Sequence, residues 1–69
     1  MRNDDVQITL RAARVNAGLT LVDAAKQIGI GKDTLMKWER KPELVNAAYQ
    51  ARISTVYKFP IDNIYFASN

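Results

Sequence analysis

The middle of the sequence predicts a pair of short helices on either side of a glycine turn. The first helix is expected over Leu21–Ile28, and Gly29 follows it directly, as glycine often follows the last helical residue. The second helix is expected over Lys32–Arg40, because Pro42 cannot continue a helix. Together they form one two-helix unit over Leu21–Arg40.

The spacing inside this unit meets the demands of two helices that cross steeply over a short turn. Such a pair needs a small residue where the helices approach, a residue that tolerates a left-handed backbone in the turn, and an apolar residue that plugs the angle. These three requirements are met by Ala25, Gly29 and Leu35. Four further apolar positions are expected to face the core: Ala24, Ile28, Ile30 and Trp38. The pattern predicts a helix-turn-helix.

A helix is also predicted before this unit, over Asp5–Ala17, with Gly18 as its C-cap signal. Its acidic and amide side chains suit the positive end of a helix dipole and offer three candidate N-caps, Asn3, Asp4 and Asp5. Its apolar residues recur at steps of three and four and predict one buried stripe, formed by Val6, Leu10, Ala13 and Ala17.

After the unit, a fourth helix is predicted over Ala47–Lys58 with Asn46 as its N-cap, and a short closing helix over Ile61–Phe66. We expect Ile61 and Ile64 to close the core. The aromatic residues lie at helical spacing in apolar stripes, so we interpret them as core residues and not as base-stacking platforms: Trp38, Tyr49 and Tyr57. The prediction is an all-α single domain over residues 1–69, a compact bundle of four helices plus a short fifth.

The amino-acid composition excludes several classes of function for this protein. The 69 residues contain no Cys and no His, which excludes disulfides and thiolate metal sites and removes the commonest general base. No glycine-rich phosphate loop or paired-carboxylate motif is present, so we expect no enzymatic activity, no metal and no cofactor. No apolar run approaches the ~18 residues of a membrane span, and the N-terminus lacks a signal peptide, so a cytoplasmic protein is expected. The net charge of +3 permits a nucleic-acid partner without requiring one.

The sequence resembles the lambda-repressor-like family, the Cro and Xre type of helix-turn-helix domain. The resemblance covers nearly the whole chain, about Ile8–Phe66. It is carried by these segments: Leu10–Arg14, Ala17–Thr20, Ala24–Ala25, Ile28–Ile30, Thr34–Arg40 and Phe59–Phe66. Two positions depart from the family's usual pattern, since Leu21 stands where Gln is common and Gly31 where Ser or Thr is common.

The resemblance implies that the second helix of the unit reads bases in the major groove. The expected base contacts are Lys32, Asp33, Met36 and Lys37. Lysine suits the guanine acceptors, a carboxylate accepts from cytosine N4, and Met36 suits a thymine methyl. The plainer interpretations stay open: a solvated Lys32, an Asp33 that serves the helix dipole and a Met36 that fills a surface gap.

Contacts to the DNA backbone are expected around the same helices. The expected phosphate contacts are Thr20, Gly31, Thr34, Arg40 and Lys41. For Arg40 and Lys41 the alternative is a structural role, because cations suit the negative end of a helix. The resemblance also implies a structural ion pair between Arg14 and Glu39, which would join the first helix to the end of the third.

The resemblance implies a sequence-specific transcriptional regulator similar to phage, prophage or mobile-element repressors and Cro proteins. We expect a homodimer on a palindromic double-stranded operator, with no small-molecule effector. Tyr65 and Phe66 are candidates for the dimer surface or, equally, for closing the core. The alternative is a protein-interaction module, or an antitoxin-like partner of a toxin, that uses the same fold; Leu21, Asp33 and the modest net charge leave room for it.

Overall fold

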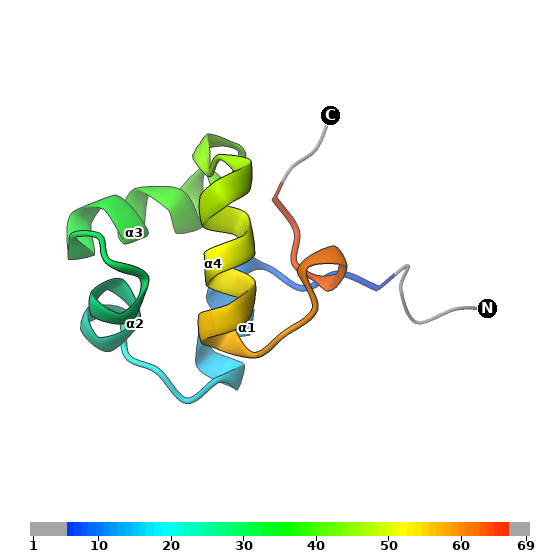
Figure 1. Ribbon diagram of the computed structural model, residues 1–69, viewed down its shortest axis with the longest axis horizontal. Helices are drawn as coiled ribbons and strands as arrows, with labels where there is room; N and C mark the ends of the chain where they lie inside the picture. The colour runs from blue at the N-terminus through cyan, green and yellow to red at the C-terminus, as the bar shows by residue number, and fades with distance from the viewer. Residues whose placement is uncertain (1–5, 67–69) are drawn as a thin grey trace.

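The computed structural model describes residues 6–66, and this part of the chain is a compact set of helices (Figure 1). In chain order the elements are α1 (Leu10–Asn16), α2 (Leu21–Ile28), α3 (Lys32–Arg40), the 3-10 turn η2 (Pro42–Leu44), α4 (Ala47–Tyr57) and the 3-10 turn η3 (Ile61–Asn63). In Figure 1, α2 and α3 lie together on one side of α4. The all-α fold with helices 2 and 3 at their predicted bounds is confirmed.

Side-chain caps explain where three of the helices begin. The hydroxyl of Thr9 accepts a hydrogen bond from the backbone N–H of Ala12 at 3.0 Å, and Thr20 does the same for Asp23 at 3.1 Å. Asn46 caps α4 through its side-chain oxygen, 2.9 Å from the N–H of Tyr49. Each cap satisfies an N–H group that has no acceptor inside its own helix.

The core lies where the four helices meet. Each helix supplies at least one fully buried side chain, and the loop before α4 and the segment after η3 add one each. The buried residues are Leu10, Ala13, Ala24, Ala25, Ile28, Leu35, Val45, Ile53, Tyr57 and Ile64. Trp38 and Tyr49 pack against this core, with ring centroids 5.3 Å apart, so the predicted core role of these aromatic residues is confirmed.

The prediction for the first helix was wrong at its start. The helix begins at Leu10, not at Asp5, and Val6 is 61% exposed instead of buried. The physical reason is a contact with the far end of the chain: Ile8 forms a parallel β-bridge with Ile64, which holds this segment extended. The N-cap candidates Asn3, Asp4 and Asp5 lie outside the described residues.

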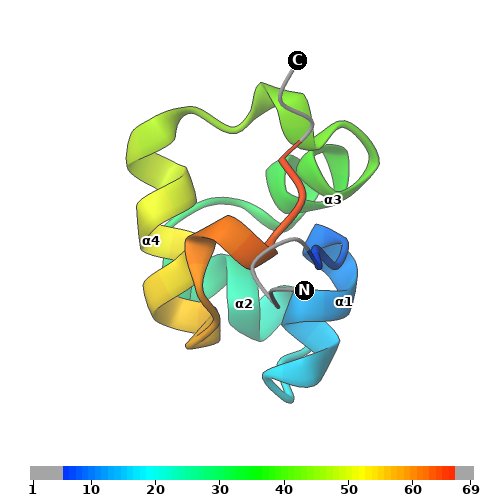
Figure 2. The same cartoon turned by 90° about the vertical axis from the view of Figure 1, so that its right-hand side faces the viewer.

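The end of the chain also differs from the prediction. Only Ile61–Asn63 is helical, as a 3-10 turn, and the residues after it pair with the segment before α1 (Figure 2). Ile8 donates its N–H to the carbonyl of Asn63 at 2.9 Å and accepts from the N–H of Tyr65 at 2.8 Å. Ile64 is buried as predicted, but Ile61 is 38% exposed, because it belongs to the 3-10 turn η3, which has no buried residue. Phe66 packs against the core, and Tyr65 is 46% exposed.

The fourth helix ends one residue earlier than predicted. Lys58 has a left-handed backbone, with φ 53° and ψ 46°, so it is the C-cap of α4 and not its last residue. The chain then turns back, and the hydroxyl of Ser54 donates to the carbonyl of Phe59 at 2.6 Å. This turn sends the chain toward η3 and the bridge with Ile8.

Candidate nucleic-acid interface

The geometry between α2 and α3 follows from three residues. Ala25 is 2% exposed, and its carbonyl accepts from the N–H of Gly29 at 2.8 Å. Gly29 has φ 93° and ψ 32°, a left-handed conformation that favours glycine because it lacks a Cβ. Leu35 is fully buried between the two helices and the rest of the core. Small residue, left-handed turn and apolar plug therefore occupy the places that the spacing predicted.

One face of α3 is left to solvent. Leu35 and Trp38 lie on the inner face, where Leu35 is buried and Trp38 is partly buried. The exposed residues of the outer face include the four expected base contacts, Lys32, Asp33, Met36 and Lys37. The fold brings these four side chains together on one helical surface, which carries two positive charges and one negative charge.

The five expected phosphate contacts lie around the ends of α2 and α3. Thr20 caps α2 with its hydroxyl oxygen, so its O–H proton is still available to a second acceptor. Gly31 precedes α3 in an extended conformation and gives that helix no side-chain cap. Thr34 is half-buried, whereas Arg40 and Lys41 are exposed at the opposite end of α3.

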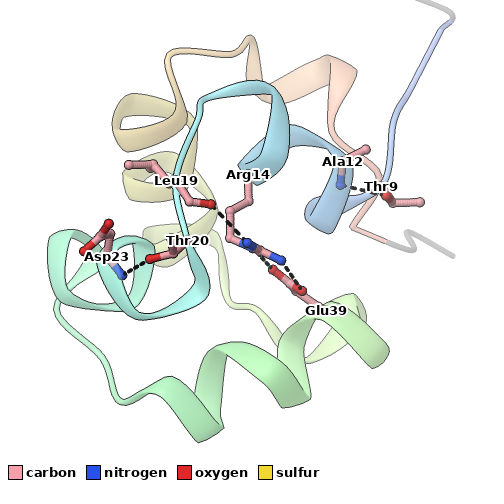
Figure 3. Close-up of polar contacts among 7 residues, drawn as sticks. All are labelled: Thr9, Ala12, Arg14, Leu19, Thr20, Asp23 and Glu39. Carbon is pink, nitrogen blue, oxygen red and sulfur yellow. Dashed lines mark hydrogen bonds and ion pairs between the residues drawn. The ribbon is translucent and has the colours of Figure 1, made fainter.

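An ion pair fixes α1 against α3 (Figure 3). Arg14 Nε lies 2.6 Å from Glu39 Oε2, and the two side chains are 12% and 11% exposed. Arg14 also donates through Nη1 to the carbonyl of Leu19 at 3.0 Å, just before α2. One guanidinium group therefore ties together α1, the start of α2 and the last turn of α3.

The hydroxyl of Tyr57 lies buried within the electrostatic field of this pair. Tyr57 is 1% exposed, and its hydroxyl has no hydrogen-bond partner within residues 6–66. Burial raises the pKa of Tyr57 from 10.0 to about 12; the negative charge of Glu39 adds to the rise, and Arg14 opposes it. The phenol is therefore neutral at any physiological pH.

Sequence reasoning missed one residue at this surface, Arg11. It lies on α1 and lines a shallow hollow together with Arg40 and Met36 of α3. Arg11 precedes Arg14 by three residues, and that spacing places both on one side of a helix. This spacing could have predicted that Arg11 lies near α3, because Arg14 was already expected to lie against the third helix.

Comparison with known families decides the class of this unit. A sequence model of the family described as "Helix-turn-helix" matches residues 10–62, from the start of α1 into η3. The chain belongs to the helix-turn-helix family. Comparisons with curated proteins and with solved structures gave no match.

The match confirms the resemblance to Cro/Xre-type helix-turn-helix domains and makes this protein a member of a DNA-binding family. The helix-turn-helix proper is α2 and α3, and the match also includes the helices that support it. Within residues 6–66, no helix has the length and apolar character needed to cross a bilayer. The same part of the chain holds no group of acidic side chains arranged to bind a metal ion.

Proposed function

We propose that this helix-turn-helix protein is a sequence-specific transcriptional regulator of the phage-repressor or Cro type. It inserts α3 into the major groove of double-stranded DNA. The observation that carries the proposal is the outer face of α3, where four side chains of different chemistry stand exposed opposite the buried Leu35. A helix with such a face presents donors, an acceptor and an apolar group to base edges at once.

Each of the four side chains suits a different feature of the groove. Lys32 and Lys37 donate to the N7 and O6 acceptors of guanine. Asp33 accepts from the amino group of cytosine and repels phosphates, so it selects against wrong sequences. Met36, which is 41% exposed, offers apolar contact to a thymine methyl.

Contacts to the phosphates of the DNA backbone then hold α3 in a fixed position in the major groove. Thr20 and Gly31 lie at the starts of α2 and α3, where unpaired N–H groups favour an anion. Arg40 and Lys41 are exposed cations at the end of α3, and Thr34 lies on the helix between them and Gly31. Contacts of this kind position the protein and carry no sequence information.

The length of α3 supports a dimer. A helix of 9 residues spans few base pairs, so two copies on half-sites one helical turn apart are needed for specificity. The proposed operator is therefore an inverted repeat bound by a homodimer, with no small-molecule effector required.

Salt dependence of duplex binding tests the proposal. Fluorescence anisotropy on a labelled duplex, titrated at several salt concentrations, should give an affinity that falls steeply and linearly on a log–log scale. Binding that is absent at low salt would contradict the proposal and favour a protein-interaction module or antitoxin-like protein with the same fold.

A further inference from the structure

The hollow beside α3 is bounded by three helices and carries a surplus of positive charge. Its walls come from α1, the first residue of α2 and the outer side of α3. The lining residues are Arg11, Arg14, Leu21, Met36, Glu39 and Arg40. Three of these are cations and one is an anion, so the hollow has a net charge of +2.

The one carboxylate in the hollow is already neutralised. Glu39 accepts from Arg14 Nε at 2.6 Å and from Nη2 at 3.5 Å, and Arg14 also bonds the carbonyl of Leu19. The side chains of Arg11 and Arg40 have no ion-pair or hydrogen-bond partner within residues 6–66, and both are exposed. Two arginines without a partner in the described part of the chain therefore line one hollow, Arg11 from α1 and Arg40 from α3.

The rest of the lining decides what kind of ligand fits. Leu21 and Met36 are apolar, so α2 gives no polar side chain to the hollow and the attraction comes from the two arginines. Guanidinium groups match the oxygens of a phosphate in geometry and charge. The hollow also adjoins the exposed face of α3, since Met36 belongs to both.

We propose that this hollow seats one phosphate of the DNA backbone between Arg11 and Arg40. The inference rests on the proposed function and adds Arg11 of α1 to its contacts. Arg11 thereby extends the bound surface from the helix-turn-helix to the first helix. The contact acts on the backbone, so it strengthens binding to all duplexes and does not choose among sequences.

The proposed contact is tested by replacing two arginines of equal charge, one in the hollow and one on a different surface of the domain. Arg11→Gln removes the proposed contact, and Arg52→Gln is the matched control on α4, in a groove that faces Gln27 of α2. Both side chains are exposed, so both variants should melt within about 3 °C of the wild type. Affinity for a labelled duplex is then measured from 50 mM to 300 mM salt, about the range over which counterion release is strong.

We expect Arg11→Gln to weaken binding about tenfold at 0.1 M salt and to lower the log–log salt slope by about 1. Arg52→Gln should change affinity less than about twofold and leave the slope unaltered. Equal effects of the two substitutions would overturn the inference, because they would reflect net charge alone. A wild-type protein without salt-dependent duplex binding would overturn the proposed function as well, so the two failures are distinguishable.

Uncharged methylphosphonate linkages locate the phosphate. Single linkages are placed along each strand of a binding duplex, and the wild type, Arg11→Gln and Arg40→Gln are compared on each. One linkage should weaken the wild type most, and it should weaken Arg11→Gln and Arg40→Gln less, because each variant keeps only one of the two arginines that contact that phosphate. If the linkages that matter to Arg11 and Arg40 are different, the two arginines do not share a phosphate.

Discussion

Arg14 and Glu39 are separated by 25 positions in the sequence, yet Arg14 Nε lies 2.6 Å from Glu39 Oε2. The contact joins the last turn of α1 to the last turn of the proposed reading helix. Both side chains are nearly buried, so neither charge is fully hydrated when its partner is missing. The pair therefore links the stability of the domain to the orientation of α3.

Glu39→Ala should lower stability and DNA affinity together. Removing the carboxylate leaves the Arg14 charge nearly buried without its partner, which costs about 2 kcal/mol, between the values for exposed and fully buried pairs. For a domain of this size that corresponds to a fall of roughly 10 °C in melting temperature. Thermal unfolding followed by circular dichroism measures it, and an unchanged melting temperature would contradict the role given to the pair.

The matched control removes both charges. In Arg14→Met with Glu39→Met, no buried charge is left unpaired, so most of the stability should return. DNA affinity should stay reduced in the double variant, because α3 has lost the bond that orients it. Full recovery of affinity would show that the pair affects DNA binding only through stability.

Tyr57→Phe should leave the free energy of unfolding unchanged or raise it by up to about 1 kcal/mol. The Tyr57 hydroxyl is buried without a hydrogen-bond partner within the described part of the chain. Folding therefore removes the water that hydrates this hydroxyl and gives it no protein hydrogen bond in return. Urea unfolding of the two proteins measures the difference. A loss above about 1 kcal/mol would mean that the hydroxyl makes a hydrogen bond in solution.

The raised pKa of Tyr57 predicts a loss of stability at alkaline pH. In the unfolded chain the phenol ionises near pH 10, whereas in the folded protein it keeps its proton to about pH 12. Below pH 10 the phenol is neutral in both states, and between these values ionisation favours the unfolded chain. From pH 9 to pH 11 the wild type should lose about 1 kcal/mol more than Tyr57→Phe. An equal loss of stability in the wild type and in Tyr57→Phe would show that the pKa of Tyr57 is not raised.

The helix-turn-helix was predictable because its determinants are local. Thr20, Gly29 and Pro42 mark helix ends by their own backbone and side-chain chemistry, and the bounds of α2 and α3 were predicted to the residue. The face of α3 that meets solvent also follows from its own periodicity, since Leu35 and Trp38 turn inward.

The two ends of the domain could not be read in this way. Ile8 is extended because it bridges Ile64, and no local pattern reports a partner 56 residues away. Val6 fits the periodicity of a helix that does not start until Leu10, so the apolar stripe was extended too far. Arg11 was missed for a related reason, because the hollow it shares with Arg40 exists only once α1 and α3 are packed.

Serine substitution at two glycines should have opposite effects. Gly29→Ser forces a side chain into a left-handed backbone at φ 93° and should cost about 1–2 kcal/mol. Gly31→Ser meets an ordinary extended backbone and open space, and it supplies the cap that α3 lacks, so it should stabilise by about 0.5 kcal/mol. Melting temperatures of both variants test this; a stabilising Gly29→Ser would contradict the turn geometry.

Selection of binding sites from a random duplex library tests whether α3 reads bases. The wild type is run beside Lys32→Ala with Lys37→Ala and beside a control with the same charge change away from α3, Lys26→Ala with Lys58→Ala. We expect the wild type and the control to recover the same inverted repeat, with half-sites about one helical turn apart, and the α3 variant to lose it. An unchanged motif in the α3 variant, or no enrichment by the wild type at low salt, would contradict base recognition by α3.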